Sequence, residues 1–168
     1  MSDTKRATIG SLRRGSRVAA VQALYQMALS GSSSETVIAE FTNLRVGRSA
    51  PSDVPDAVDE ALFADIVRGV TTGRDTIDPM IGAALDKARS LERLEILMQA
   101  ILRAGVYELL ERDDIDPALT INEYVAVADA FFNEREPALV NAVLDRIAQN
   151  LKIGEPAAEP VHDVASDR

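Results

Sequence analysis

The chain has 168 residues, no Cys, no Trp, one His and a formal net charge of -9, with 46% hydrophobic and 27% charged residues. This composition fits one globular domain and excludes disulfide frameworks, thiol nucleophiles and zinc sites built on cysteine. The one histidine, His162, lies in a proline-containing stretch near the C-terminus, which argues against Ser-His-Asp catalysis and histidine-ligated metals.

Positive charge is concentrated at the N-terminus. Residues 1–17 contain five Lys and Arg residues against one Asp, a net charge of +4, so the remaining 151 residues carry -13. An acidic body repels polyanions at long range. A nucleic acid would therefore have to bind locally, at the basic segment.

The first predicted element is an amphipathic helix from about Leu12 to Ser30, preceded by a polar basic arm. Its apolar residues recur at helical spacing, and Gly31 supplies a usual C-terminal stop. Gln22 and other polar residues interrupt the apolar run, which excludes a secretory signal and a membrane span. We therefore expect a cytoplasmic protein with no membrane association.

Two further helices are predicted in the first half of the chain. One runs from Ser34 to about Arg45 and is followed by a loop rich in Gly, Ser and Pro. The next starts near Asp56, where acidic residues suit the positive end of the helix dipole, and continues to about Leu85. Because a proline inside a helix costs about 3 kcal/mol, Pro79 predicts a kink or a break around residues 76–78.

Three helical patterns follow in the second half. Residues 90–112, which Ser90 would cap, form the most apolar one and are expected to be central in the fold. Residues 116–131 open with Asp-Pro, a helix cap followed by proline in the first turn, and residues 136–154 open with Glu-Pro and end at Gly. Since no stretch alternates as a strand would, the predicted fold class is all-α, with six to seven helices.

The segment after the last helix is acidic, contains Pro and Ala, and shows no hydrophobic period, which is typical of a disordered tail. The expected organisation is a flexible basic arm, one helical domain made of two subdomains, and this tail. Their expected bounds are 1–11 for the arm, 12–153 for the domain, about 12–88 and 89–153 for its subdomains, and 154–168 for the tail.

The sequence contains no catalytic or metal-binding constellation that we can identify. Asp113 and Asp114 are adjacent at a predicted helix end, where a solvated loop explains them. Gly69 and Gly73 lie inside a helical pattern and match no phosphate-binding loop. We therefore expect no enzymatic activity, no cofactor and no metal ion.

Arg13, Arg14 and Arg17 are the more informative feature. They fall in or just before the first turn of the predicted first helix, where the dipole disfavours each cation by about 0.3–1 kcal/mol. An anionic partner would compensate them, and the phosphates of RNA or DNA are natural candidates. An acidic protein partner and purely solubilising surface arginines remain alternatives.

Several short motifs occur in the order and spacing of one known family. They are Arg13–Arg17, Val21–Gln26, Ala100–Arg103, Val106–Leu109, Ile121–Glu123 and Val140–Asp145. Together they resemble the bacterial transcription antitermination factor NusB family, over about Leu12 to Leu151. The resemblance implies a small all-helical fold of two subdomains.

The same resemblance implies an adaptor role without enzymatic activity. Members of this family bind boxA-type single-stranded RNA of rRNA operon leaders together with the ribosomal protein NusE, and join an antitermination complex on RNA polymerase. The family's RNA contact is the arginine-rich start of its first helix. The candidate RNA-binding residues here are Arg13, Arg14, Arg17, Gln22, Arg6 and Lys5.

Six residues of the motifs are expected to be mainly structural: Tyr25, Arg103, Tyr107, Asn122, Glu123 and Asn141. The two tyrosines lie on apolar stripes and are expected in the core, with base stacking as the alternative. The two asparagines are poor helix formers and are expected to anchor buried hydrogen bonds, with base contact as the alternative.

Five positions depart from the usual pattern of the family: Gly15, Met98, Asp129, Leu139 and Ala142. Asp129 replaces a usual lysine, so RNA binding would be weaker or more dependent on a partner if that surface faces RNA. The alternative is that these positions are merely surface. The departures and the acidic body motivate a second hypothesis, a protein-interaction or homodimerisation module with weak or no specific RNA binding.

Overall fold

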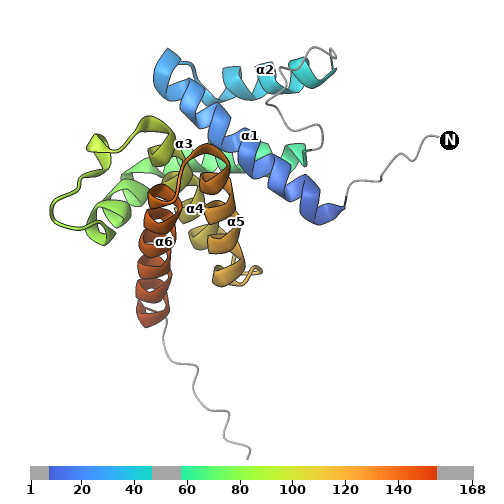
Figure 1. Cartoon of the computed structure of the whole chain (residues 1–168). Helices are drawn as coiled ribbons and strands as arrows, with labels where there is room; N and C mark the ends of the chain where they lie inside the picture. Colours follow the sequence, from blue (N-terminus) through green and yellow to red (C-terminus); the bar gives the residue numbers. More distant parts are fainter. Residues whose placement is uncertain (1–7, 47–57, 155–168) are drawn as a thin grey trace, which may run out of the picture.

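The first half of the chain contributes three helices to the computed structural model, which describes residues 8–46 and 58–154 (Figure 1). They are α1 (Ile9–Ser30), α2 (Ser34–Val46) and α3 (Glu60–Ala84). The second half adds a 3-10 turn, η1 (Leu91–Arg93), and the helices α4 (Ile96–Glu111), α5 (Pro117–Phe131) and α6 (Arg135–Gly154). The described residues contain no strand, so the all-α prediction is confirmed.

Local caps explain several of these helix bounds. The Thr8 side chain accepts a hydrogen bond from the Ser11 amide at the start of α1, and Gly31 ends the helix in the left-handed conformation, with φ 72°. The Asp59 and Asp116 carboxylates cap α3 and α5 in the same way, and Pro117 follows in the first turn of α5 as the sequence predicted.

Three predicted boundaries are wrong. Helix α1 begins at Ile9, so the last residues of the expected arm are helical. Helix α3 continues through Pro79, so the break expected around residues 76–78 is wrong, whereas a kink there stays a prediction. Ser90 precedes the 3-10 turn, and α4 begins only at Ile96. The predicted arm and tail fall largely on residues 1–7 and 155–168, outside the described residues, and the two subdomains stay a prediction.

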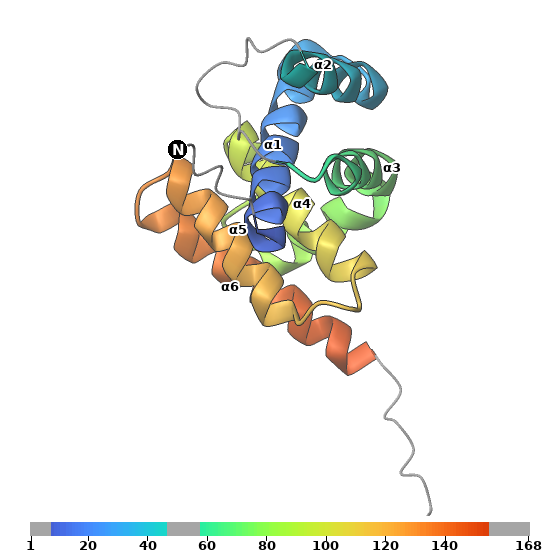
Figure 2. The same ribbon diagram turned by 90° about the vertical axis from the view of Figure 1, so that its right-hand side faces the viewer.

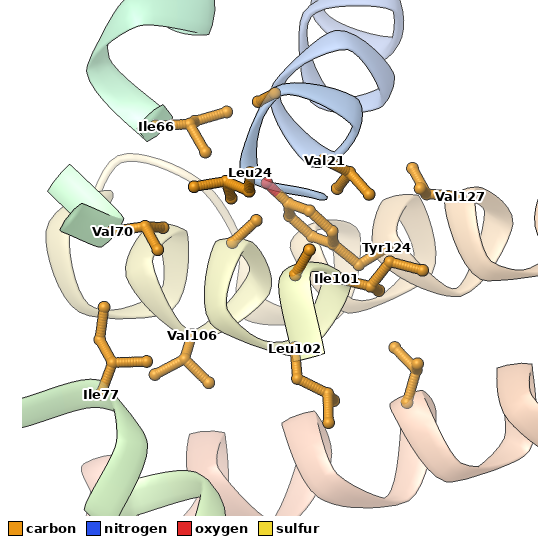
Figure 3. Packing of buried hydrophobic residues seen from close by; sticks show 14 of the residues in the cluster. Val21, Leu24, Ile66, Val70, Ile77, Ile101, Leu102, Val106, Tyr124 and Val127 are labelled. Atoms are coloured by element: carbon orange, nitrogen blue, oxygen red, sulfur yellow. The ribbon is translucent and has the colours of Figure 1, made fainter. Parts of the chain in front are cut away.

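Helix α4 is central, as its apolar sequence predicted. It contacts α1, α3, α5 and α6, and the buried apolar side chains of both halves of the chain form one cluster around it. Helices α5 and α6 lie side by side, and the N-terminal end of α1 contacts α5 (Figure 2). In Figure 3 Tyr124 of α5 lies among Val21 and Ile101, with its hydroxyl oxygen directed toward α1.

A close contact between α3 and α4 occurs at Gly69. A Cβ atom at this position would lie 2.1 Å from two ring atoms of Tyr107, so the tyrosine ring packs directly against the α3 backbone. Gly105 of α4 is similarly close to Leu144 of α6, at 2.8 Å from an added Cβ. The two glycines therefore allow the central helix to approach a neighbour on each side.

Candidate nucleic-acid interface

The arginines of α1 do not lie where the sequence placed them relative to the helix start. Because Ile9 is the first helical residue, Arg13 and Arg14 lie in the second turn and Arg17 in the third. The effect of the helix dipole falls off within the first turn. The electrostatic penalty predicted for these three arginines is therefore wrong. The need for an external anion, which was inferred from that penalty, is wrong with it.

Arg17 is buried and bound by a carboxylate of the fold. Its Nε and Nη2 atoms donate to the two oxygens of Glu108 on α4, at 2.8 and 3.0 Å, and the two side chains are 4% and 0% exposed. This is the bidentate geometry that suits an arginine-carboxylate pair. An internal anion thus compensates Arg17, in contrast to the predicted contact with phosphate at the surface.

Tyr124 completes this buried cluster. Its hydroxyl donates to Glu108, so the carboxylate joins α1, α4 and α5. Burial, together with the charge and hydrogen bond of Glu108, holds the pKa of Tyr124 well above its usual value. Burial disfavours the charged form of Arg17, but its bond to Glu108 and the charge of that carboxylate outweigh this and raise the pKa of the guanidinium.

Glu123 of α5 connects the buried cluster to the surface. Both of its carboxylate oxygens lie 3.2 Å from Nε of Arg14, and one lies 3.8 Å from Nη1 of Arg17. The Glu123 side chain is 13% exposed, whereas that of Arg14 is 72% exposed. The Arg14 side chain is therefore accessible to a ligand, while the Glu123 carboxylate of α5 binds its Nε atom.

The other candidate RNA contacts have less defined surroundings. Arg13 is half-buried, and no hydrogen bond or ion pair joins it to another described residue. Gln22 is half-buried one turn after Val18 on the same helix. Lys5 and Arg6 lie outside the described residues. Arg13 and Arg14 are thus the predicted cationic contacts that the described surface presents.

Comparison with known proteins agrees with the motif series. The sequence model of the NusB family matches residues 14–149. The chain belongs to the NusB family. A transcription antitermination protein NusB from Sinorhizobium fredii is 46% identical over 140 residues, which is 83% of this chain and 88% of the relative. That of Rhizobium rhizogenes is 44% identical over 146 residues, 87% and 91% of the two chains.

Solved NusB structures share the fold. NusB from T. maritima superposes with a TM-score of 0.65 at 29% identity, covering 81% of this chain and 89% of its own. A structure of NusB and NusE in complex with double-stranded RNA superposes with a TM-score of 0.68 at 23% identity, covering 85% and 99%. The predicted NusB-like fold class is confirmed.

Two residues of the NusB motifs join α4 to α3, in line with a structural role. Arg103 binds both carboxylate oxygens of Asp78, at 2.8 and 3.1 Å. Tyr107 is half-buried and donates to Asp65 at 3.0 Å. Burial and the bond to Asp65 raise the pKa of Tyr107 to about 12.

Three other motif residues are exposed, contrary to prediction. Tyr25 is 39% exposed, because it lies beside the inward stripe of α1. Asn122 and Asn141 both face solvent, on α5 and α6, and no hydrogen bond joins either side chain to another described residue. The expected buried anchors are therefore wrong. A surface position leaves these residues accessible to a ligand or partner.

The positions that depart from the NusB pattern have different surroundings. Gly15 and Met98 are buried, the latter at 2% exposure, so Met98 is part of the core. Leu139 is half-buried and, with Met98 and Phe132, lines a cavity of about 290 Å³ between η1, α4 and the start of α6. Asp129 and Ala142 are exposed.

Metal-binding clusters and membrane-spanning helices are both absent from residues 8–46 and 58–154. In that part of the chain no three His, Cys, Asp or Glu side chains are grouped so as to hold a metal ion. None of the helices described is long and apolar enough to span a membrane.

Sequence analysis missed Glu108, which is fully buried and holds both Arg17 and Tyr124. A signal was available, because Glu108 lies inside a strongly apolar helix. A carboxylate in such a helix requires a partner. The sequence alone did not identify that partner as Arg17, which is 91 residues away.

Proposed function

We propose that this NusB-family chain is an RNA-binding adaptor in transcription antitermination. In this role it binds boxA-type single-stranded RNA of rRNA operon leaders together with NusE, and joins a complex on RNA polymerase. The observation that carries the proposal is the family match over residues 14–149, because relatives at 44–46% identity are transcription antitermination proteins.

The surface of α1 supports RNA as the ligand. Arg14 is 72% exposed, and Arg13 lies beside it on the first half of the helix. If each neutralises one phosphate of a single strand, the logarithm of the binding constant falls with the logarithm of salt concentration with a slope of about -1.4. Contacts by Lys5 and Arg6 would steepen the slope to about -2.8.

Fluorescence anisotropy tests this proposal directly. A labelled boxA RNA and a scrambled RNA of equal composition are titrated with the protein, with and without NusE, across a salt series. We expect tighter binding to boxA than to the scrambled RNA, and a further gain with NusE. Absence of discrimination under all conditions, by a chain with an intact helical circular dichroism spectrum, would overturn the proposal.

Two charge-reversal variants, one on α1 and one elsewhere, test whether RNA binds at the surface of α1. Arg13→Glu/Arg14→Glu should abolish measurable RNA binding at physiological salt. Lys87→Glu/Lys152→Glu is the matched control, because it makes the same charge change at two exposed residues outside α1. An equal loss of affinity in both variants would point to a general effect of net charge instead of a site on α1.

Homodimerisation is the second candidate function, favoured by apolar exposure on the other half of α1. Tyr25 and Leu29 are 39% and 59% exposed, and Ile96 at the start of α4 is 37% exposed. Such side chains are common at protein interfaces. Sedimentation analysis over a concentration series tests it, since a mass that stays monomeric at high concentration would exclude a dimer. Leu29→Glu should weaken any dimer observed.

A further inference from the structure

The guanidinium of Arg14 is held from one side. Its Nε atom contacts both carboxylate oxygens of Glu123 at 3.2 Å, and no hydrogen bond joins its Nη1 or Nη2 atom to another described residue. The Arg14 side chain is 72% exposed. The outer, two-pronged end of the guanidinium, which can bind a phosphate bidentately, is therefore directed away from Glu123.

Glu123 itself is fixed by its surroundings. Its side chain is 13% exposed, and Nη1 of the buried Arg17 lies 3.8 Å from its carboxylate. Arg17 is already paired with Glu108, so the four charges of Arg14, Arg17, Glu108 and Glu123 sum to zero. A phosphate that approaches Arg14 therefore meets a neutral cluster with a carboxylate close behind the arginine.

We propose that Glu123 is a specificity-determining residue of the RNA site: it fixes the direction of Arg14 and lowers the affinity for non-specific polyanions. This inference rests on the proposed function. A ligand whose phosphate fits the fixed direction of Arg14 gains the bidentate contact. A ligand that would need Arg14 to turn has to break the contact with Glu123 as well.

The size of the effect follows from Coulomb's law. A phosphate on the outer end of Arg14 would lie roughly 7 Å from the Glu123 carboxylate. At the effective dielectric constant of a protein surface, about 20, and at physiological salt, repulsion over that distance weakens binding about fivefold. The same factor should be regained when the carboxylate is replaced by a neutral amide.

Glu123→Gln tests the inference, because the amide oxygen can still accept from Nε of Arg14 while the charge is lost. We expect this variant to bind scrambled RNA about fivefold more tightly. BoxA RNA should gain less, because the neutral amide holds Arg14 less firmly than the carboxylate does, so discrimination of boxA from scrambled RNA should fall. Glu111→Gln, which removes one exposed charge at the end of α4, is the matched control and should change neither value. In an Arg14→Gln background the gain from Glu123→Gln should disappear.

A second variant separates orientation from charge. Glu123→Asp keeps the charge but shortens the side chain, so it should reduce discrimination without tightening the binding of scrambled RNA. The Nε proton of Arg14 gives a readout independent of RNA. Its exchange with water, followed by nuclear magnetic resonance, should accelerate in Glu123→Asp relative to the wild type.

Two outcomes would overturn the inference while leaving the proposed function intact. One is a wild-type chain that discriminates boxA while Glu123→Gln leaves the affinity for scrambled RNA unchanged or lower. The other is a gain from Glu123→Gln that persists in the Arg14→Gln background. A wild-type chain that never distinguishes boxA from scrambled RNA overturns the proposed function, and this inference with it.

Discussion

Removing Arg17 should destabilise the fold far more than removing Arg14, although the two arginines are three residues apart. Glu108 is fully buried, and its oxygens accept hydrogen bonds from Arg17 and Tyr124. Arg17→Ala leaves that carboxylate buried without a counter-charge, which typically costs about 3–5 kcal/mol. Arg14→Ala breaks an ion pair whose arginine is 72% exposed, and exposed pairs contribute at most about 1 kcal/mol.

Urea denaturation followed by circular dichroism measures both free energies of unfolding. An Arg17→Ala loss no larger than that of Arg14→Ala would refute the reasoning. The double variant Arg17→Met/Glu108→Leu provides the control, because it replaces the pair with apolar side chains and leaves no buried charge. It should recover part of the loss and leave a cost of about 1–3 kcal/mol from the unpartnered hydroxyl of Tyr124. If it folds and still binds RNA, Arg17 acts inside the fold and not on the ligand.

Three further predictions concern stability. Gly69→Ala should cost about 1–3 kcal/mol of unfolding free energy, because the new Cβ would lie 2.1 Å from the Tyr107 ring, whereas Gly82→Ala on the same helix enters open space and should stabilise by about 0.5–1 kcal/mol. Asp116→Ala removes the α5 cap and should cost about 1 kcal/mol by urea denaturation. Because folding raises the pKa of Tyr107 from 10.0 to about 12, its contribution to stability is complete below pH 10 and is lost as the pH rises from 10 to 12. Urea denaturation across that range should therefore show a smaller decline for Tyr107→Phe than for the wild type, and an equal decline would contradict the assignment.

The helices were predictable because their signals are local. Apolar residues at helical spacing, Gly31 after α1 and the Asp-Pro pair at the start of α5 each act within a few residues. The errors arose where tertiary contacts outweigh local preference. Helix α3 continues through Pro79 because Ile77 and Ile81 on either side of it are both buried in the core.

The site was harder to predict because it depends on contacts between distant residues. The sequence placed candidate cations on α1 and included Glu123 among the structural residues. It did not show that Glu123 lies against Arg14, which is 109 residues away. The asparagines illustrate the same limit, since poor helix propensity at Asn122 and Asn141 does not reveal whether a side chain faces the core or solvent.

The different surroundings of Arg14 and Arg17 follow from their positions along α1. Val21 and Leu24 are buried on the inward stripe of α1, and Arg17 precedes them by four and seven residues, so it lies on that same stripe. Arg14 lies near the same stripe, seven residues before Val21, but it is closer to the start of α1 and is 72% exposed. An arginine that is buried on this stripe must meet a carboxylate inside the fold, because an isolated buried charge is too costly. The depth of each position along α1, more than the helical period, therefore separates the arginine that stabilises this fold from the arginine that can bind phosphate.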